Sequence, residues 1–454
     1  METVRALAAA FTLFITSVLT IYVLLITRLY RRKRTADPGN PMSLQWHILV
    51  PCMNEQSVVN ETIKRLVRLP RFDARVDVHF WLIDDASDDN TRAILCRWAR
   101  HIPAQIHVVE RDLPHARQGK SHALNHAYRC IQEWRKTDTR SRSSHSTVIG
   151  VVDADARLDP MTFRALSGPD FFGCPTVGAI QQDVRMHNLD RAPGTSRLAR
   201  AFMVLQDIEF RASIAAIQMS RRRTQSVAMG GNGQWTRLQA LEDAAGQHGV
   251  PWHGSLLEDF ELGLHLLSEG WETRFTPDSW VSQEALPDLR RFLRQRTRWC
   301  QGSMQCARYL PKLWRSRNIN PSTLLEMTWY LAQPWLFIIG TFLYPLVSVD
   351  LIGLAIRNPG RLAAWTLHDG GWMFIVMFAV VALGPLASWA FTYRRACVSK
   401  SDFGRVAALR YGLFYVLYVH LSYVVAWRAL GRLVLRRNTW VKTTRNADVR
   451  LALN

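Results

Sequence analysis

The sequence predicts an α/β domain with a mostly parallel sheet, bordered at both ends by α-helical membrane segments. Two observations lead to this prediction. Short apolar runs with strand character alternate with helical stretches in the first third of the chain. Four longer apolar blocks lie outside that region, one at the N-terminus and three in the last third. With 454 residues, 48% of them apolar, the chain can supply one globular domain and a membrane part.

The N-terminal apolar block is interpreted as a transmembrane helix. Residues Ala6 to Thr27 carry no charge, and the run is too long for the apolar part of a signal peptide and lacks a small-residue cleavage site. Arg28 and the basic run Arg31 to Arg34 follow it. Because basic residues accumulate on the cytoplasmic side of membranes, the chain after this helix is expected in the cytoplasm. This first segment comprises residues 1–34.

Residues 35–322 carry the pattern of the α/β domain. Strands are expected at 46–50, 78–83, 107–109 and 148–152, and helices near 57–68, 91–100 and 120–135. The polar stretch Lys136 to Ser146 is expected to be a surface loop. The chain has no Gly-x-Gly-x-x-Gly sequence and no P-loop, which argues against dinucleotide-binding and NTPase functions.

Residues 323–430 are expected to form the second membrane region, because they contain the apolar blocks Met327 to Ile356, Trp372 to Tyr393 and Tyr411 to Trp427. The first block is longer than one span needs and contains two prolines, so a kink or an interfacial segment is expected. Arginines flank the last block on both sides, although a span must separate its flanks. Either this block is re-entrant or interfacial, or the long block crosses twice, or the charge rule fails at one flank.

The net charge of +20 suits an anionic partner, such as a nucleic acid, an anionic membrane surface or an anionic substrate. No nucleic-acid-binding module is visible, and much of the arginine lies beside apolar stretches, which favours the membrane explanation. The seven cysteines form no Cys-x-x-Cys pair and no Cys/His metal spacing. They are expected to be reduced residues of a cytosolic domain.

Polar loops follow the first two predicted strands. The first strand ends in Pro51 to Glu55, and the second runs into the acidic stretch Asp84 to Asn90. Ligands bind at the carboxyl ends of parallel strands, although such residues also form turns and helix caps. Gly119-Lys120 begins the third helix, where a lysine can meet phosphate or can simply be solvated.

Asp153 and Asp155 follow the apolar run Val148 to Val152. Two carboxylates separated by one residue at a strand end can hold one hard divalent cation. The remaining coordination positions would go to diphosphate oxygens and water. Mg²⁺ or Mn²⁺ is implied, and the sequence does not choose between them.

Two further motifs lie later in the domain. Glu258-Asp259 begins a helix that stops at Gly270, and its acids either serve chemistry or favour the positive end of the helix dipole. Upstream, the glycine-rich run Gly230 to Trp235 suits neither a regular helix nor a regular strand and is expected to be a loop.

The pentad Gln295-Arg296-Thr297-Arg298-Trp299 precedes the second membrane region. Its tryptophan offers an apolar face to a sugar ring, and Arg298 or Arg296 can bind diphosphate in a fork geometry. The stretch is also rich enough in arginine to be an amphipathic helix on the membrane surface. Both interpretations can hold together.

Together these motifs resemble the processive family 2 glycosyltransferases, the group containing cellulose, chitin and hyaluronan synthases, from Pro51 to Trp299 and again at Trp440. The resemblance implies a GT-A-like, Rossmann-like cytoplasmic domain. It makes Asp259 the general base, with Glu258 as the alternative. The other implied roles are donor binding by Glu55, Asp84, Asp85, Lys120, Asp153, Gln295 and Arg298, acceptor binding by Gly231, Asn232, Gly233, Glu258 and Trp299, and metal binding by Asp153 and Asp155.

The basic tail, residues 431–454, contains Trp440, Thr443 and Arg445, which resemble an element that closes over the donor in some synthases. A basic juxtamembrane tail explains these residues equally well. The gating role therefore stays open beside the membrane role.

The resemblance implies an integral protein of the plasma or inner membrane that transfers a sugar, with inversion, from a nucleotide sugar to a growing β-linked polysaccharide. A UDP-sugar is the expected donor, and the membrane helices are expected to help pass the product across. One alternative is a single-transfer glycosyltransferase acting on a lipid or short acceptor. Another is an inactive sugar-binding or scaffold membrane protein, against which the intact acidic and aromatic motifs argue. The sugar and the linkage are not identified.

Overall fold

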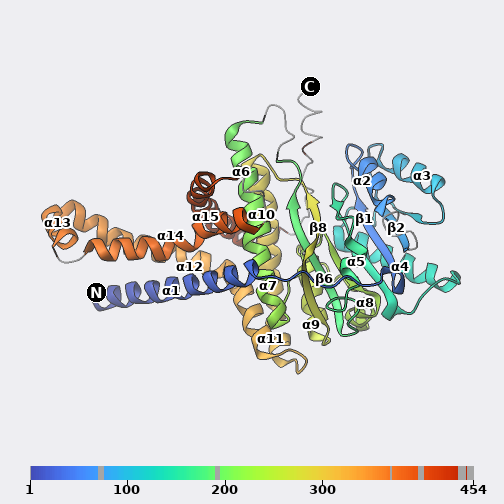
Figure 1. Ribbon diagram of the computed structural model, residues 1–454, viewed down its shortest axis with the longest axis horizontal. Coiled ribbons are helices and arrows are strands. Elements are labelled where there is room, and N and C mark those ends of the chain that lie inside the picture. The colour runs from blue at the N-terminus through green and yellow to red at the C-terminus, as the bar shows by residue number, and fades with distance from the viewer. Residues whose placement is uncertain are drawn as a thin grey trace.

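The computed structural model describes residues 2–69, 76–189, 195–368, 371–396, 403–437 and 446 (Figure 1). The strands are β1 Gln45–Cys52, β2 Asp77–Asp85, β3 Ile106–Arg111, β4 Thr147–Val151, β5 Arg157–Leu158, β6 Val177–Met186, β7 Gln234–Arg237 and β8 Glu272–Gln283. The helices among and after them are α2 Val59–Leu66, α3 Thr91–His101, α4 Lys120–Thr137, α5 Thr162–Leu166, α6 Arg197–Ile208, α7 Ala215–Thr224, α8 Leu238–Ala245, α9 Glu258–Ser268, α10 Leu289–Cys306 and α11 Leu310–Arg315. A π-helix, η4 Glu209–Ile214, joins α6 to α7. The remaining helices are α1 Glu2–Arg31, α12 Pro321–Arg357, α13 Pro359–Leu367, α14 Gly371–Ala396 and α15 Arg405–Val434.

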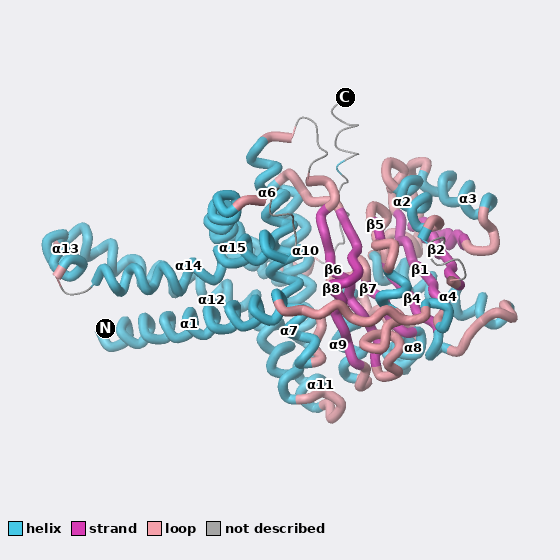
Figure 2. The backbone as a smooth tube through the Cα atoms, viewed as in Figure 1, coloured by secondary structure: helices cyan, strands magenta, loops and turns pink. Residues whose placement is uncertain are grey.

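The strands of the described chain form one sheet in the order β3-β2-β1-β4-β7-β6-β8-β5 (Figure 2). The half from β3 to β4 is parallel, as predicted, and contains all four predicted strands. In the other half β7 runs antiparallel to β4 and β6, and β5 runs antiparallel to β8. β6 pairs in parallel with β8, so most of the strand pairings are parallel, as predicted. The antiparallel pairings of β7 and β5 make the sheet mixed, and β5 is too short to show a periodicity.

Alternating side chains of β1 separate two hydrophobic cores, because successive residues of a strand point to opposite faces. Trp46, Ile48 and Val50 pack with residues of α2, α3 and α5. Leu49 points the other way and packs with residues of α4 and α8. Both faces of the parallel half are covered, so its strand ends are what remains open to a ligand.

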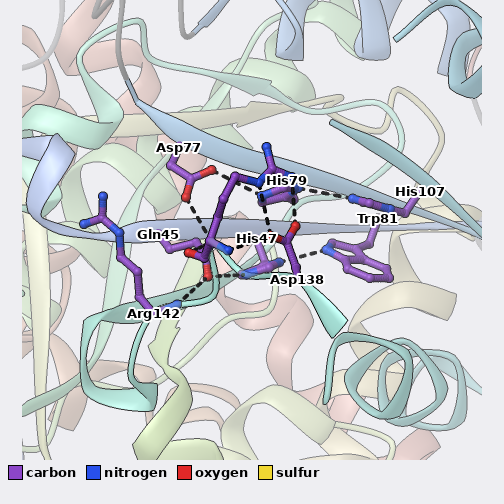
Figure 3. Close-up of polar contacts among 9 residues, drawn as sticks. Gln45, His47, Asp77, His79, Trp81, His107, Asp138 and Arg142 are labelled. Carbon is purple, nitrogen blue, oxygen red and sulfur yellow. Dashed lines mark hydrogen bonds and ion pairs between the residues drawn. The ribbon is translucent and has the colours of Figure 1, made fainter. Parts of the chain in front are cut away.

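A histidine and tryptophan cluster lies across β1, β2 and β3 (Figure 3). The rings of His47 and His79 stack at 5.2 Å, and His79 Nδ1 lies 3.2 Å from Nε2 of His107. Trp81 Nε1 donates to Nδ1 of His47 at 2.9 Å, and Trp134 of α4 packs against all three histidines. Because His47 Nδ1 accepts a hydrogen bond from the indole N–H of Trp81, this nitrogen cannot be protonated while that hydrogen bond is kept.

Acid is expected to destabilise the domain through this cluster. Burial lowers the pKa of His107 to about 4 and the pKa of His47 well below its ordinary value. An unfolded histidine titrates near ~6.5, so the folded state binds fewer protons than the unfolded state as the pH falls below that value. The contribution of these neutral histidines to the free energy of unfolding should therefore be fully present above pH ~6.5 and should decline toward pH ~4.

Thermal unfolding midpoints from about pH 8 to about pH 5 would test this, and His107→Gln should reduce the decline. His101→Gln, a change at an exposed histidine of α3, should leave the decline as it is in the wild type. Equal acid sensitivity of the wild type and His107→Gln would contradict the prediction.

Each of the four predicted membrane blocks lies in one long helix, namely α1, α12, α14 and α15. The block with Pro334 and Pro345 falls within the single helix α12. Outer parts of α1, α12 and α14 extend away from the sheet, toward the left in Figure 1. Among the described residues, α15 is the helix that is both long and apolar enough to cross a membrane by length and composition.

Candidate active site

One pocket at the carboxyl ends of β1 and β4 collects most of the predicted site residues. It encloses about 1580 Å³ between protein atoms, adjoining open solvent included. The predicted residues that line it are Glu55, Asp85, Lys120, Asp153, Asp155, Asn232, Glu258, Asp259, Gln295, Arg298 and Trp299. Among the predicted residues, Asp84, Gly231 and Gly233 do not line it themselves but adjoin residues that do.

The loops after β1 and β2 are held together by hydrogen bonds between their polar residues. Asn54 N donates to Ser87 Oγ at 3.0 Å, and Asn54 Oδ1 accepts from the backbone N of Asp88 at 2.8 Å. Glu55 N donates to Thr91 Oγ1 at 2.8 Å. These caps and turns, which alone would be ordinary loop chemistry, fix one rim of the pocket.

The two adjacent carboxylates after β2 differ in environment. Asp85 pairs with Arg111 and reaches the pocket lining. Asp84 is fully buried, and burial raises its pKa. Asp85 is therefore the carboxylate that a ligand in the pocket could meet, and Asp84 lies behind it.

Lys120 begins α4 beneath a group of acids. Its Nζ lies 2.7 Å from Oδ1 of Asp153. Burial alone would lower the pKa of Lys120, but the nearby carboxylates of Asp153, Glu258 and Asp259 together raise it. A lysine that stays charged in a pocket is suited to a phosphate group.

Asp153 and Asp155 both line the pocket and offer the hard oxygen donors that Mg²⁺ and Mn²⁺ prefer. Within the part of the chain that the structure describes, no set of three or more His, Cys, Asp or Glu side chains is arranged to hold a metal ion. A cation here would thus take at most these two carboxylates from the protein. The donor set fits a metal whose other ligands come from diphosphate and water.

The glycine-rich loop lies against the predicted base. Asn232 Oδ1 accepts from the backbone N of Asp153 at 3.2 Å, and Gln181 clamps the loop by accepting from Gly230 N at 2.8 Å and donating to Asn232 O at 2.9 Å. Gly231 has φ +74°, and a Cβ there would lie 2.6 Å from Asp259 Oδ2. Only glycine lets this backbone approach the carboxylate.

Asp259 lies in the pocket at the start of α9 and has a raised pKa. Its Oδ1 accepts from the backbone N of Phe260 at 2.7 Å. Burial and the neighbouring Glu258 raise the pKa of Asp259 to about 7, against the opposing charge of Lys120. A carboxylate with a pKa near the working pH can take a proton and release it again.

Gly231→Ala is expected to lower the turnover number on the order of 10²-fold, because the added methyl must displace the Asp259 carboxylate. A residue with a side chain also costs about 1–2 kcal/mol in this left-handed conformation. Gly249→Ala is the matched control, since Gly249 has φ +67° and an added Cβ meets no atom within 4 Å. Both variants should lose similar stability in thermal unfolding. Wild-type turnover in Gly231→Ala would show that Asp259 has room to move.

The pentad lies in α10, and its members face different surroundings. Gln295, Arg298 and Trp299 line the pocket, and Arg298 Nη1 donates to the carbonyl of Leu256 at 3.4 Å. Arg296 does not line it. Its guanidinium is bonded to Glu209 at 2.6 Å and lies 4.5 Å from the Trp299 ring centroid. Of the two arginines offered by the sequence for diphosphate, Arg298 is therefore the one that lines the pocket, and diphosphate binding by it stays a prediction.

Sequence reasoning missed the wall formed by β6 and η4. Gln181, Gln182 and Asp183 on β6 and Phe210 on η4 all line the pocket. Asp183 is fully enclosed, and burial raises its pKa to about 6 despite the nearby Arg185. Three consecutive polar residues inside a strand were a usable signal, because burying polar groups is costly. Phe210 gave none. The predicted gating residues Trp440, Thr443 and Arg445 lie outside the described residues.

Comparisons with known proteins agree with this arrangement. A family profile described as Glycosyltransferase like family 2 matches residues 45–302, more than half of the chain. The chain is 29% identical over 283 residues to a beta-monoglucosyldiacylglycerol synthase of Synechocystis sp., with 62% of this chain and 52% of that protein covered. It is 28% identical over 265 residues to the synthase of the same name from Nostoc sp., with 58% and 49% covered. The chain thus spans about half the length of these curated relatives.

Among solved structures, the fold is similar to that of the mannosyltransferase PcManGT from Pyrobaculum calidifontis, solved in complex with GDP-Man and Mn²⁺. The TM-score is 0.51 at 18% identity, with 92% of this chain and 98% of that chain covered. This similarity supports the predicted GT-A-like α/β domain, with a mixed sheet.

Proposed function

Because the chain belongs to the Glycosyltransferase like family 2, we propose that it transfers a hexose from a nucleotide sugar to a hydroxyl group of a lipid acceptor, with inversion at the anomeric carbon. The observation that carries this proposal is that one pocket holds Asp259 together with charged residues suited to a donor and apolar residues suited to a lipid. The relatives named as beta-monoglucosyldiacylglycerol synthases support a glucosyl donor and a diacylglycerol-like acceptor.

The polar wall, which comprises Glu55, Asp85, Lys120 and Arg298, would bind the donor. Glu55 and Asp85 would contact the nucleotide, and the cations Lys120 and Arg298 would meet the diphosphate. A divalent cation held by Asp153 and Asp155 would supply positive charge to the leaving diphosphate. The Mn²⁺ in the PcManGT complex supports such a cation, and neither Mn²⁺ nor Mg²⁺ is preferred by the residues present.

The reaction itself needs one proton acceptor. Asp259 takes the proton of the acceptor hydroxyl while the oxygen of that hydroxyl attacks the anomeric carbon. The bond from that carbon to the diphosphate oxygen breaks, and the nucleoside diphosphate leaves. Attack from the side opposite the leaving group inverts the configuration. Glu258 and the enclosure of the site keep the pKa of Asp259 near that of a useful base.

An apolar wall of the pocket is formed by Phe210 and Ile214 of η4 and Ala215 of α7, and the apolar residues Val184 and Leu286 also line the pocket. Helix α1, which carries membrane-type sequence, ends next to this wall, since Tyr30 in its last turn donates a hydrogen bond to the carbonyl of Arg211 in η4 at 2.9 Å. A lipid acceptor could therefore reach Asp259 from the bilayer side with its apolar part against protein.

Outward-facing apolar side chains on the long helices support insertion in a bilayer. Leu24 of α1, Phe342 of α12, Trp372 of α14 and Leu417 of α15 are between 52% and 69% exposed. A soluble monomer rarely exposes apolar surface in such continuous helices. The basic residues that follow α1 place the α/β domain, residues 35–322, on the cytoplasmic side in this proposal.

A panel of radiolabelled nucleotide sugars, offered to membranes containing the protein, tests the proposal. One sugar added to an organic-soluble lipid is the expected result. A high-molecular-weight, water-soluble product would instead favour the polysaccharide synthase suggested by the pentad. No donor turnover with Mg²⁺ or Mn²⁺ present would favour an inactive sugar-binding or scaffold protein.

A further inference from the structure

The apolar wall of the pocket is built on an uncommon helical turn. Glu209–Ile214 forms a π-helix, a rare conformation that occurs mostly as single turns inside α-helices and frequently at functional sites. Both Phe210 and Ile214 of this turn line the pocket. The position of the turn therefore decides the shape of the surface that an acceptor would meet.

Glu209, the first residue of the turn, accepts two hydrogen bonds from other parts of the chain. Arg296 Nη2 of α10 donates to Glu209 Oε2 at 2.6 Å, and the hydroxyl of Tyr418 from α15 donates to the same oxygen. The Arg296 and Glu209 side chains are 13% and 21% exposed, and Tyr418 is 7% exposed. Charge-assisted hydrogen bonds are stronger than neutral ones, and partial exclusion from solvent strengthens them further.

Arg296 also contacts two aromatic residues that line the pocket. Its guanidinium lies 4.5 Å from the centroid of Trp299 and 5.3 Å from that of Phe210. Those two rings also meet edge to face, with centroids 6.4 Å apart at 82°. Cation–π and edge-to-face contacts depend on distance and orientation, so a displaced Arg296 would release both rings.

Two more hydrogen bonds join α15 to the same face of α10. Arg428 Nε donates to Thr297 Oγ1 at 3.3 Å, and Arg432 Nε donates to Gln301 Oε1 at 2.8 Å. Thr297 belongs to the pentad. The helix that bears Tyr418 is thus attached to the pentad helix over several turns.

We propose that Glu209, Arg296 and Tyr418 are positioning residues that hold Phe210 and Trp299 as the acceptor wall, so that acceptor use depends on the docking of α15. This inference rests on the proposed function, because that proposal assigns the wall to the acceptor. Donor binding takes place at the polar wall, which these three residues do not line.

The test compares Tyr418→Phe, Glu209→Gln and Arg296→Lys with the wild type, using the full chain in membranes. Tyr411→Phe is the matched control, because Tyr411 lies on the same helix and its ring packs on Phe403 outside the network. The acceptor KM is measured with the acceptor that the wild type glycosylates. Donor affinity and donor hydrolysis without acceptor are measured in parallel.

Tyr418→Phe and Glu209→Gln should raise the acceptor KM about tenfold or more, the effect of losing a hydrogen bond to a charged group. Donor affinity and hydrolysis should stay within about twofold of the wild type. Combining the two changes should add little to Glu209→Gln alone, because both remove the same contact. Arg296→Lys keeps the charge but loses the planar stack and should also raise the acceptor KM.

A fall in donor affinity as large as the rise in acceptor KM would overturn the inference, since a general distortion of the domain would explain both changes. A Tyr418→Phe variant indistinguishable from Tyr411→Phe would also overturn it. A wild-type product that is a polysaccharide would overturn the lipid-acceptor proposal instead. The comparison of variants would then be made with that saccharide acceptor, so the two failures are separate.

Discussion

Asp259→Asn is expected to lower the turnover number at least ~10²-fold while leaving donor affinity nearly unchanged. The asparagine fills the same space but cannot accept the proton of the acceptor hydroxyl. Donor affinity should persist because Lys120, Arg298 and the two acids after β4 are untouched. Initial rates of sugar transfer and titration with the nucleoside diphosphate measure the two quantities separately.

The pH dependence gives a second, independent readout of the same residue. The pKa of Asp259 is raised to about 7, so the transfer rate should rise with pH through that value as the carboxylate ionises. Glu258→Gln removes a negatively charged neighbour of Asp259. The rise of the transfer rate with pH should therefore shift to lower pH while activity is retained. Near-normal activity of Asp259→Asn, with Glu258→Gln inactive, would assign the base to Glu258 instead.

The parts of the site that were predictable from sequence are those near strand ends and helix starts. Asp153 follows β4, Lys120 begins α4 and Asp259 lies in the first turn of α9. Each lies at one end of a periodic segment, and such ends can be read from the sequence. Because parallel strands bring their carboxyl ends to one edge of a sheet, residues far apart in sequence could be expected to meet there. Their pairing, such as the 2.7 Å contact of Lys120 with Asp153, needed the structure.

The parts that were not predictable depend on contacts between distant segments. Nothing local distinguishes Arg296 from Arg298, since both lie on one helix two residues apart. Their surroundings differ because Glu209, 87 positions away, accepts a hydrogen bond from Arg296. The π-helix that presents Phe210 leaves no periodic signal over six residues. The antiparallel β7 is likewise set by the position of its neighbours β4 and β6 rather than by its own four residues.

Asp155→Ala is expected to weaken the binding of the nucleoside diphosphate at least ~10-fold when Mg²⁺ or Mn²⁺ is present, since a charge-assisted contact is worth about 1.5–3 kcal/mol. The two carboxylates after β4 line the pocket, and their oxygens match the preference of these ions. Excess chelator should lower the affinity of the wild type to that of the variant, and added Mg²⁺ or Mn²⁺ should restore it only in the wild type.

The pairing of Asp153 with Lys120 separates the roles of the two acids. Asp153→Asn should also leave the partly buried Lys120 without its 2.7 Å carboxylate partner, so this variant should lose stability as well as affinity. Asp155→Ala lacks that effect and is the cleaner test of the metal. Asp170→Ala, at an acid 60% exposed and outside the pocket, is the matched control and should bind the nucleotide like the wild type. Full wild-type transfer activity in excess EDTA would reject a metal requirement, and the diphosphate would then be held by Lys120 and Arg298 alone.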